Sequence, residues 1–146
     1  MAIEENSDVR EYQLIEPIGK IDLSIYKDFI DFEILTDELV LTKDRAKHVD
    51  DRRFGVLDEF KEYVLETVNN PDYIIRDEKN PKNTLKVIKK IKNTDDKNKY
   101  THIVIRFVIE GDNVEYKNSI MTMWAIGDKK LEQLKRNKEV LFSKDE

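Results

Sequence analysis

The spacing of apolar residues changes once along this chain, after Pro71, and this change constrains the fold more than any other feature. Between residues 56 and 69 large apolar residues recur at intervals of three and four, as on one face of a helix. They are Leu57, Phe60, Val64 and Val68. Between residues 100 and 110 apolar residues alternate instead, as in a strand with one buried face. These are Ile103, Ile105, Phe107 and Ile109.

The order of these two patterns predicts an α+β domain with N-terminal helices followed by an antiparallel β-sheet. We expect helices at 43–53 and 56–69 and at least three later strands, at 84–91, 100–110 and 115–126. A parallel sheet, or a helix in place of the alternating segment, would contradict this prediction.

Shorter signals predict where elements begin and end. Thr42 is a good N-cap for the first helix, and Asp128 is a good N-cap for a short terminal helix. Apolar runs at 39–41 and 73–75 predict two short strands, and Gly111 begins a turn after the clearest strand.

Length, charge and cysteine content indicate one cytoplasmic domain. The 146 residues suit a single domain spanning 35–146, on which we expect the acidic residues 1–34 to pack as an N-terminal extension. No apolar run approaches the ~18 residues that cross a bilayer. The acidic N-terminus is unlike a secretory signal, so we expect no membrane association. The absence of cysteine excludes disulfides and thiolate chemistry.

Few residues suggest chemistry, and His48 is the foremost. The four glycines form no phosphate-binding loop, and two histidines without cysteine form no zinc pattern. On the predicted helix His48 lies near Arg45, Arg52 and Arg53, which could hold a phosphate beside the imidazole. The alternative is an exposed or structural histidine. The pair at 50–51 is interpreted as solvated carboxylates, although 31 acidic residues leave a Mg²⁺ site open.

A lysine-rich segment and two strands supply further candidates. Residues 82–99 hold seven lysines and two aspartates, which suits either an anionic ligand or a solvated strand and loop. Arg106, in the clearest strand, lies on a solvent face or in a ligand groove. Thr122 and Trp124 share one face of the next strand, where packing and substrate contact are both possible.

Four short stretches, in this order, resemble a known family. They are LTKDRAKHVDDRR at 41–53, NNPDYIIRDEKNPKNTLKVIKKI at 69–91, YTHIVIRF at 100–107 and KNSIMTMW at 117–124. Together they are similar to the barnase–EndoU–colicin–RelE-like nucleases carried by phages and other mobile elements. The residues at the family's pattern positions are Thr42, Arg45, His48, Arg52, Pro71, Asp72 and Thr122. Arg53 stands where the pattern has a second histidine.

The resemblance implies a toxin-like endoribonuclease that uses no metal or other cofactor. In such enzymes the RNA 2′-hydroxyl attacks the adjacent phosphate while a base and an acid transfer protons and cations stabilise the phosphorane. The implied catalytic residues are His48 for proton transfer, Arg106 as a phosphate clamp and Thr122 as a hydrogen-bond donor. The implied substrate-binding residues are Arg45, Arg53, Lys86, Lys89 and Trp124, the last by stacking on a base.

The same resemblance implies the partners. They are RNA, with transfer RNA as one candidate substrate, and an inhibitor or immunity protein in the cytoplasm of a bacterial host. It implies no particular oligomeric state.

A second interpretation is a non-enzymatic interaction protein of a phage or mobile element, with the same fold and a degenerate site. The net charge of -5 favours it, because long-range attraction to RNA would be weak. Clustering of His48, Arg106 and Thr122 in one cleft would favour the nuclease, and their dispersal would favour the interaction protein.

Overall fold

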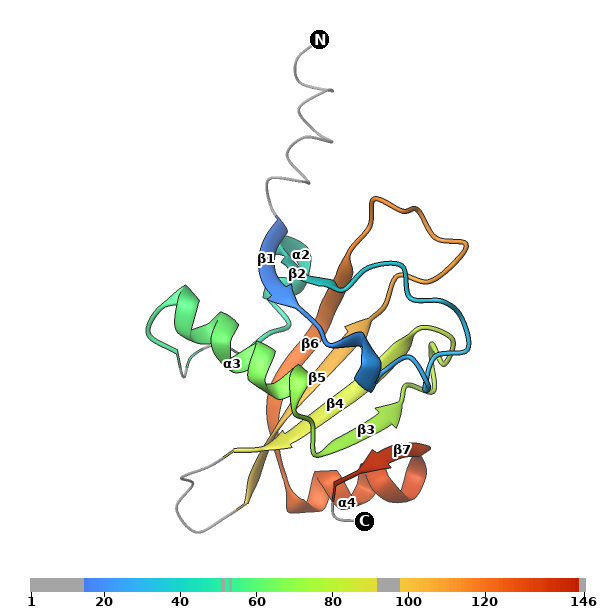
Figure 1. The fold of residues 1–146 in the computed structure, drawn as a ribbon. Coiled ribbons are helices and arrows are strands. Elements are labelled where there is room, and N and C mark those ends of the chain that lie inside the picture. The colour runs from blue at the N-terminus through green and yellow to red at the C-terminus, as the bar shows by residue number, and fades with distance from the viewer. Residues whose placement is uncertain (1–14, 51, 53, 92–97, 145–146) are drawn as a thin grey trace.

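A seven-stranded mixed β-sheet forms the centre of the computed structural model, which describes residues 15–50, 52, 54–91 and 98–144 (Figure 1). The strands are β1 (Ile15–Lys20), β2 (Glu38–Thr42), β3 (Tyr73–Arg76), β4 (Thr84–Lys90), β5 (Lys99–Arg106), β6 (Asn118–Gly127) and β7 (Val140–Ser143). Their order across the sheet is β1-β2-β6-β5-β4-β3-β7. Every neighbouring pair is antiparallel except β2 and β6, which run parallel.

The helical elements are short and lie between strands. They are the 3-10 turn η1 (Leu23–Ile25) and the helices α2 (Lys43–Ala46), α3 (Leu57–Asn69) and α4 (Asp128–Asn137). No helix in the described part of the chain is long and apolar enough to cross a membrane.

The prediction of N-terminal helices followed by an antiparallel sheet is wrong. Two strands, β1 and β2, precede α2 and α3, and the sheet is mixed because β2 pairs in parallel with β6. β1 was not predicted from the sequence, because Pro17 and Gly19 are residue types that usually interrupt strands. In the structure the pairing of β1 with β2 shifts register between these two residues, and Gly19 has a φ of 154°, so the irregularity is accommodated within an edge strand.

The helix predicted at 43–53 is also wrong beyond its first turn. Thr42 caps α2 as expected, since its Oγ1 accepts the backbone N–H of Arg45 at 3.3 Å. After α2 the chain extends so that Val49 pairs with Met123 of β6. The Met123 N–H donates to the His48 carbonyl at 3.0 Å, and the Asp50 N–H donates to the Met123 carbonyl at 2.8 Å. Two sheet hydrogen bonds and the packing of Val49 on the core replace helix continuation.

Other local predictions are confirmed with small shifts of boundary. The helix expected at 56–69 is α3, and the strands expected at 84–91, 100–110 and 115–126 are β4, β5 and β6. The short strands expected at 39–41 and 73–75 are β2 and β3. The terminal helix is α4, although Gly127 is its N-cap and Asp128 lies in its first turn.

The sheet has two faces, which we call the α3 face and the α4 face after the helices that pack on them (Figure 1). The α3 face carries the larger core, in which alternate residues of the central strands are fully buried. Among them are Leu85, Val87, Ile103, Ile105, Ile120 and Met123. On the α4 face a smaller cluster lies under α4. It consists of Tyr73, Ile75, Ile88, Tyr100, Ile126, Leu131 and Leu134.

Candidate functional site

Polar side chains continue along the α4 face beyond the cluster under α4. Strand register groups them into rows that cross β4, β5 and β6. The rows are Thr84–Arg106–Ser119, Lys86–Val104–Thr122 and Ile88–His102–Trp124. Four of the predicted site residues therefore share one face of the sheet. They are Lys86, Arg106, Thr122 and Trp124.

His48 joins this face from a different part of the chain. Because Val49 pairs in parallel with Met123, His48 lies alongside Thr122 and Asp50 lies alongside Trp124. Neighbouring strands are about 4.8 Å apart, so His48 and Thr122 are next to each other. Val49 packs on the core of the α3 face, whereas the His48 side chain, in the turn after α2, is exposed.

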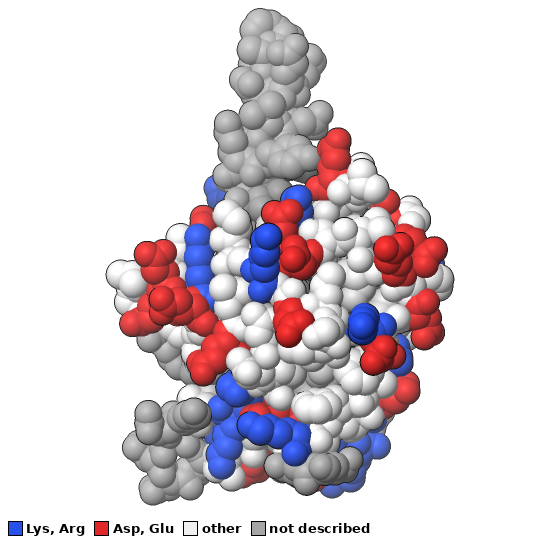
Figure 2. Space-filling view, viewed as in Figure 1, with Lys and Arg blue, Asp and Glu red and all other residues white. Residues whose placement is uncertain are grey.

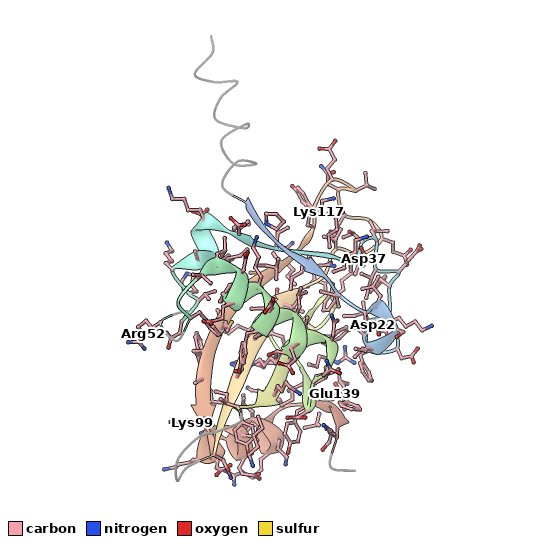
Figure 3. All side chains as sticks on the ribbon, turned by 60° about the vertical axis from the view of Figure 1, so that its left-hand side comes forward. Asp22, Asp37, Arg52, Lys99, Lys117 and Glu139 are labelled. Atoms are coloured by element: carbon pink, nitrogen blue, oxygen red, sulfur yellow. The ribbon has the colours of Figure 1, made fainter. Side chains whose placement is uncertain are left out.

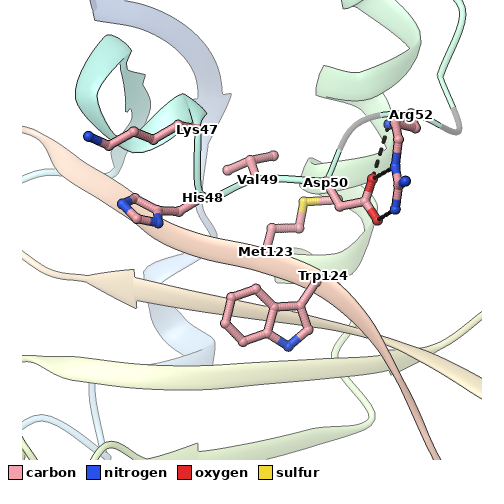
Figure 4. A pocket seen from close by; sticks show the side chains of 7 residues that line it. All are labelled: Lys47, His48, Val49, Asp50, Arg52, Met123 and Trp124. Carbon is pink, nitrogen blue, oxygen red and sulfur yellow. Dashed lines mark hydrogen bonds and ion pairs between the residues drawn. The ribbon is translucent and has the colours of Figure 1, made fainter.

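An open pocket of about 400 Å³ lies at this edge of the α4 face. Its lining consists of Lys47, His48, Val49, Asp50, Arg52, Met123 and Trp124. Figure 4 shows His48 and the Asp50–Arg52 pair at opposite ends of the lining, with Trp124 between them. The volume falls within the range of small-ligand sites, so a nucleotide-sized group can be accommodated.

Asp50 and Arg52 form a two-point ion pair within the lining. The Arg52 Nε and Nη2 donate to the two Asp50 carboxylate oxygens at 2.9 and 3.0 Å. These bonds raise the pKa of the guanidinium above its ordinary value. The Arg52 side chain is 87% exposed and projects outward (Figure 3), so it remains accessible to an anion.

Sequence reasoning missed Asp50, which it treated as a solvated surface carboxylate. The signal that could have identified it is the alternation of His48, Val49 and Asp50, two polar residues flanking one apolar residue. Alternation of this kind suits an extended segment, but the arginines around His48 favoured a helix.

The structure does not bring every predicted residue to the pocket. Arg106 is exposed on the α4 face one row beyond Thr122, and neither residue lines the pocket. Arg45 lies on α2 and is half-buried. Arg53 lies outside the described residues. Of the three predicted catalytic residues, His48 and Thr122 are therefore adjacent, and Arg106 is a diagonal neighbour of Thr122.

The two predicted lysines occupy opposite faces of β4. Lys89 lies on the α3 side, where its Nζ donates to the Asn70 carbonyl at 2.9 Å. Lys86 lies on the α4 face, but its side chain is 12% exposed and pairs with Asp77 at 3.9 Å and Glu78 at 3.8 Å. Neither lysine is placed to meet a phosphate in the pocket.

His102 and the hydroxyl oxygen of the half-buried Thr122 are polar groups that are buried and unpaired in the described part of the chain. Within the described residues, neither ring nitrogen of His102 nor the Oγ1 of Thr122 has a partner. Burial, with smaller contributions from Lys86 and Lys130, lowers the pKa of His102 to about 4, so its imidazole is neutral. The Trp124 ring lies 5.9 Å from the His102 ring, centroid to centroid, and Trp124 is 42% exposed. Sequence reasoning placed His102 on this face but assigned it no role.

Two further observations concern ions. Nowhere in the described ranges do three or more His, Asp or Glu side chains come together as metal ligands. On the face shown in Figure 2, acidic and basic side chains are intermixed over most of the surface, so that view presents no extended field of one sign.

Comparisons with protein-family models, curated proteins and solved structures find no match to this chain.

Proposed function

We propose that this chain is a metal-independent endoribonuclease-like protein of a phage or mobile element, and that it cleaves RNA at the pocket beside β6. One observation carries the proposal. A single open pocket is lined by an imidazole, a carboxylate paired with a guanidinium, and an indole, contributed by His48, Asp50, Arg52 and Trp124. The sequence resemblance to phage-borne nucleases supplies the reaction class.

The reaction needs two groups that exchange protons on either side of a phosphate. The 2′-oxygen forms a bond to phosphorus and gives up its proton to a base, while the bond to the 5′-oxygen breaks and an acid protonates that oxygen. His48 and Asp50 flank Val49, the residue that pairs with Met123, and both line the pocket. We assign Asp50 as the base and His48 as the acid, so that a carboxylate takes the role of the second imidazole.

The remaining groups bind the substrate and stabilise charge. Arg52 and Lys47 supply exposed cations at the pocket, and Arg52 keeps donors available beyond those that bind Asp50. Trp124 provides a partly exposed ring on which an unpaired base can stack. Arg106 and Thr122 contact the phosphate only if the RNA extends along the α4 face from the pocket.

Incubation with total RNA, with and without chelator, tests the proposal. Cleavage should survive the chelator, and the products should end in 2′,3′-cyclic phosphate or 3′-phosphate because the nucleophile is the RNA's own hydroxyl. His48→Ala should lower the rate by about 10²–10⁴-fold if His48 transfers a proton in the transition state. Asp50→Asn should give a similar loss of rate, because an amide cannot accept the proton of the 2′-hydroxyl as the Asp50 carboxylate does.

The matched control is Lys43→Ala, on the exposed surface of α2 and outside the pocket lining, which should keep the wild-type rate. Cleavage that requires Mg²⁺, or that persists unchanged in His48→Ala, would contradict the mechanism.

Two observations favour the second candidate, the non-enzymatic interaction protein. Of His48, Arg106 and Thr122, whose clustering in one cleft would favour the nuclease, only His48 lines the pocket. The Asp50 carboxylate offsets the charge of Arg52 in the pocket, and the whole chain is acidic, so attraction to RNA is weak. Absence of cleavage on every RNA offered, including transfer RNA, would select this candidate.

A further inference from the structure

We propose that His102 and Thr122 form the polar floor of a base-recognition subsite, and that Trp124 is the movable cover of that floor. The ligand would be the hydrogen-bonding edge of one unpaired nucleobase, next to the phosphate held in the pocket. The inference rests on the proposed RNA substrate and goes further, because it assigns base selectivity to residues outside the pocket lining.

The first argument is the cost of leaving these groups unpaired. His102 is 4% exposed, and neither of its ring nitrogens has a partner in the described chain. The Thr122 hydroxyl, in the adjacent row of the same face, is also buried and has no hydrogen-bond partner in the described chain. Buried polar groups in folded proteins are almost always paired, and each unpaired one requires an explanation. Phenylalanine and valine would fill the same volumes without that cost.

The second argument is the position of Trp124. It is the cross-strand partner of His102 on β6, its ring is tilted by 60° against the imidazole, and it also lines the pocket. A side chain that is 42% exposed has space to change rotamer. Rotation of the indole away from β5 would open a direct path from the pocket to both unpaired groups.

The third argument is the chemistry that the floor offers. A neutral imidazole presents one donor and one acceptor, and a hydroxyl presents both. Nucleobase edges carry donors and acceptors side by side, and a base extruded from its stack is read by such groups together with an aromatic ring. The displaced indole supplies that ring, so stacking and edge recognition can occur together.

The test uses the fact that Trp124 is the chain's single tryptophan, which makes its fluorescence a specific reporter. The probes are four 2′-O-methyl homotrinucleotides, of A, C, G and U, which cannot be cleaved because the nucleophile is blocked. Titration should change the indole emission, and the tightest and weakest trinucleotides should differ in Kd by about fivefold or more, as for a hydrogen bond to a buried group.

Matched variants separate recognition from packing. His102→Phe and Thr122→Val keep the volume and remove the polar atoms, so each should bring the ratio of Kd values toward 1. Thr122→Ser keeps the hydroxyl and should keep the ratio. A trinucleotide of abasic sites should bind wild type and variants alike, and thermal melting followed by circular dichroism confirms that each variant is folded.

The outcomes distinguish the inference from the proposed function. An unchanged ratio in folded His102→Phe and Thr122→Val, or a wild-type ratio of 1, would overturn the subsite even if the protein cleaves RNA through His48. Discrimination between bases without any cleavage would support the subsite and overturn the catalytic proposal. Failure of the wild type to bind any trinucleotide would overturn the subsite.

Discussion

The α3 face and the α4 face of the sheet are built from alternating residues of the same strands, yet they differ in how completely their buried polar groups are paired. On the α3 face the buried hydroxyls are paired: Tyr26 donates to the Val68 carbonyl, and Tyr63 bonds Thr101. On the α4 face the Tyr100 hydroxyl donates to Asp128 at 2.9 Å, but neither ring nitrogen of His102 nor the buried Oγ1 of Thr122 has a partner among the described residues.

This difference shows which face of the sheet stabilises the fold and which face keeps polar groups available for a ligand. Among the described residues, the three buried side-chain polar atoms without partners belong to His102 and Thr122 on the α4 face, close to an open pocket, and none lies on the α3 face. Such violations are expected at functional sites, because stability is relinquished there for binding.

The largest effect is expected on the α3 face. Ile103 is fully buried between Val87 and Met123, so Ile103→Ala should lower the free energy of unfolding by about 2–5 kcal/mol. The measurement is urea unfolding, with His102→Phe, one residue earlier on the opposite face, as the control. The control should equal or exceed the wild type in stability, because it removes unpaired polar atoms. Equal losses in the two variants would remove the distinction between the faces.

The next effect is the pH dependence caused by His102. Its pKa is lowered from 6.5 to about 4 in the folded protein, so the unfolded chain binds a proton first as the pH falls. This contribution to stability is full above pH 6.5 and declines between pH 6.5 and 4, by on the order of 3 kcal/mol.

Urea unfolding at pH 7 and pH 4.5 measures the decline. Carboxylates also titrate in this interval, so the informative quantity is the difference between wild type and His102→Phe. A variant that loses as much stability as the wild type would show that His102 is solvated rather than buried.

A smaller effect separates two lysines of β4. Lys86→Gln should lower the free energy of unfolding by about 1–3 kcal/mol, because Asp77 is buried beside it and loses its cation. Lys89→Gln, on the other face, should cost less than about 1 kcal/mol, since it removes an exposed hydrogen bond to the Asn70 carbonyl. Chemical denaturation of both variants in parallel provides the comparison, and a larger loss for Lys89 would reverse it.

The smallest effect on stability is expected for Arg106, which is exposed on the α4 face. Arg106→Ala should change the free energy of unfolding by no more than about 0.5 kcal/mol. If Arg106 contacts one phosphate, the log–log slope of RNA affinity against salt should become shallower by about 0.7. Binding measured at several salt concentrations tests this, and an identical slope would exclude the contact.

Local elements of the fold could be predicted from the sequence because their signals are local. The stripe of α3 and the alternation of β5 each follow from burial of one face. β1 was missed because an edge strand tolerates Pro17 and Gly19, and β7 was missed because four residues carry too little periodicity. The parallel pairing of β2 with β6 has no local signature, so the sheet order could not be predicted.

The candidate site was predicted only in part for the same reason. His48 was selected for its cationic neighbours on a helix, whereas the structure places it in the turn after α2, where its carbonyl accepts the Met123 N–H of β6. Asp50 and His102 carried no distinguishing motif. Their importance arises from register across β5 and β6, which the sequence alone does not specify.

The pairing of β2 with β6 also sets the order in which the chain can assemble. β3, β4 and β5 are joined by short antiparallel steps to one another, but Leu39 must wait for Asn118 to be present before it can pair. Loop closure over so long a stretch is entropically costly and belongs to the late part of folding. One wall of the pocket is the segment that follows β2, and another is β6 itself. We therefore expect a growing chain on the ribosome to possess no pocket until β6 has emerged, so that any activity begins only after residue 127 has left the ribosome.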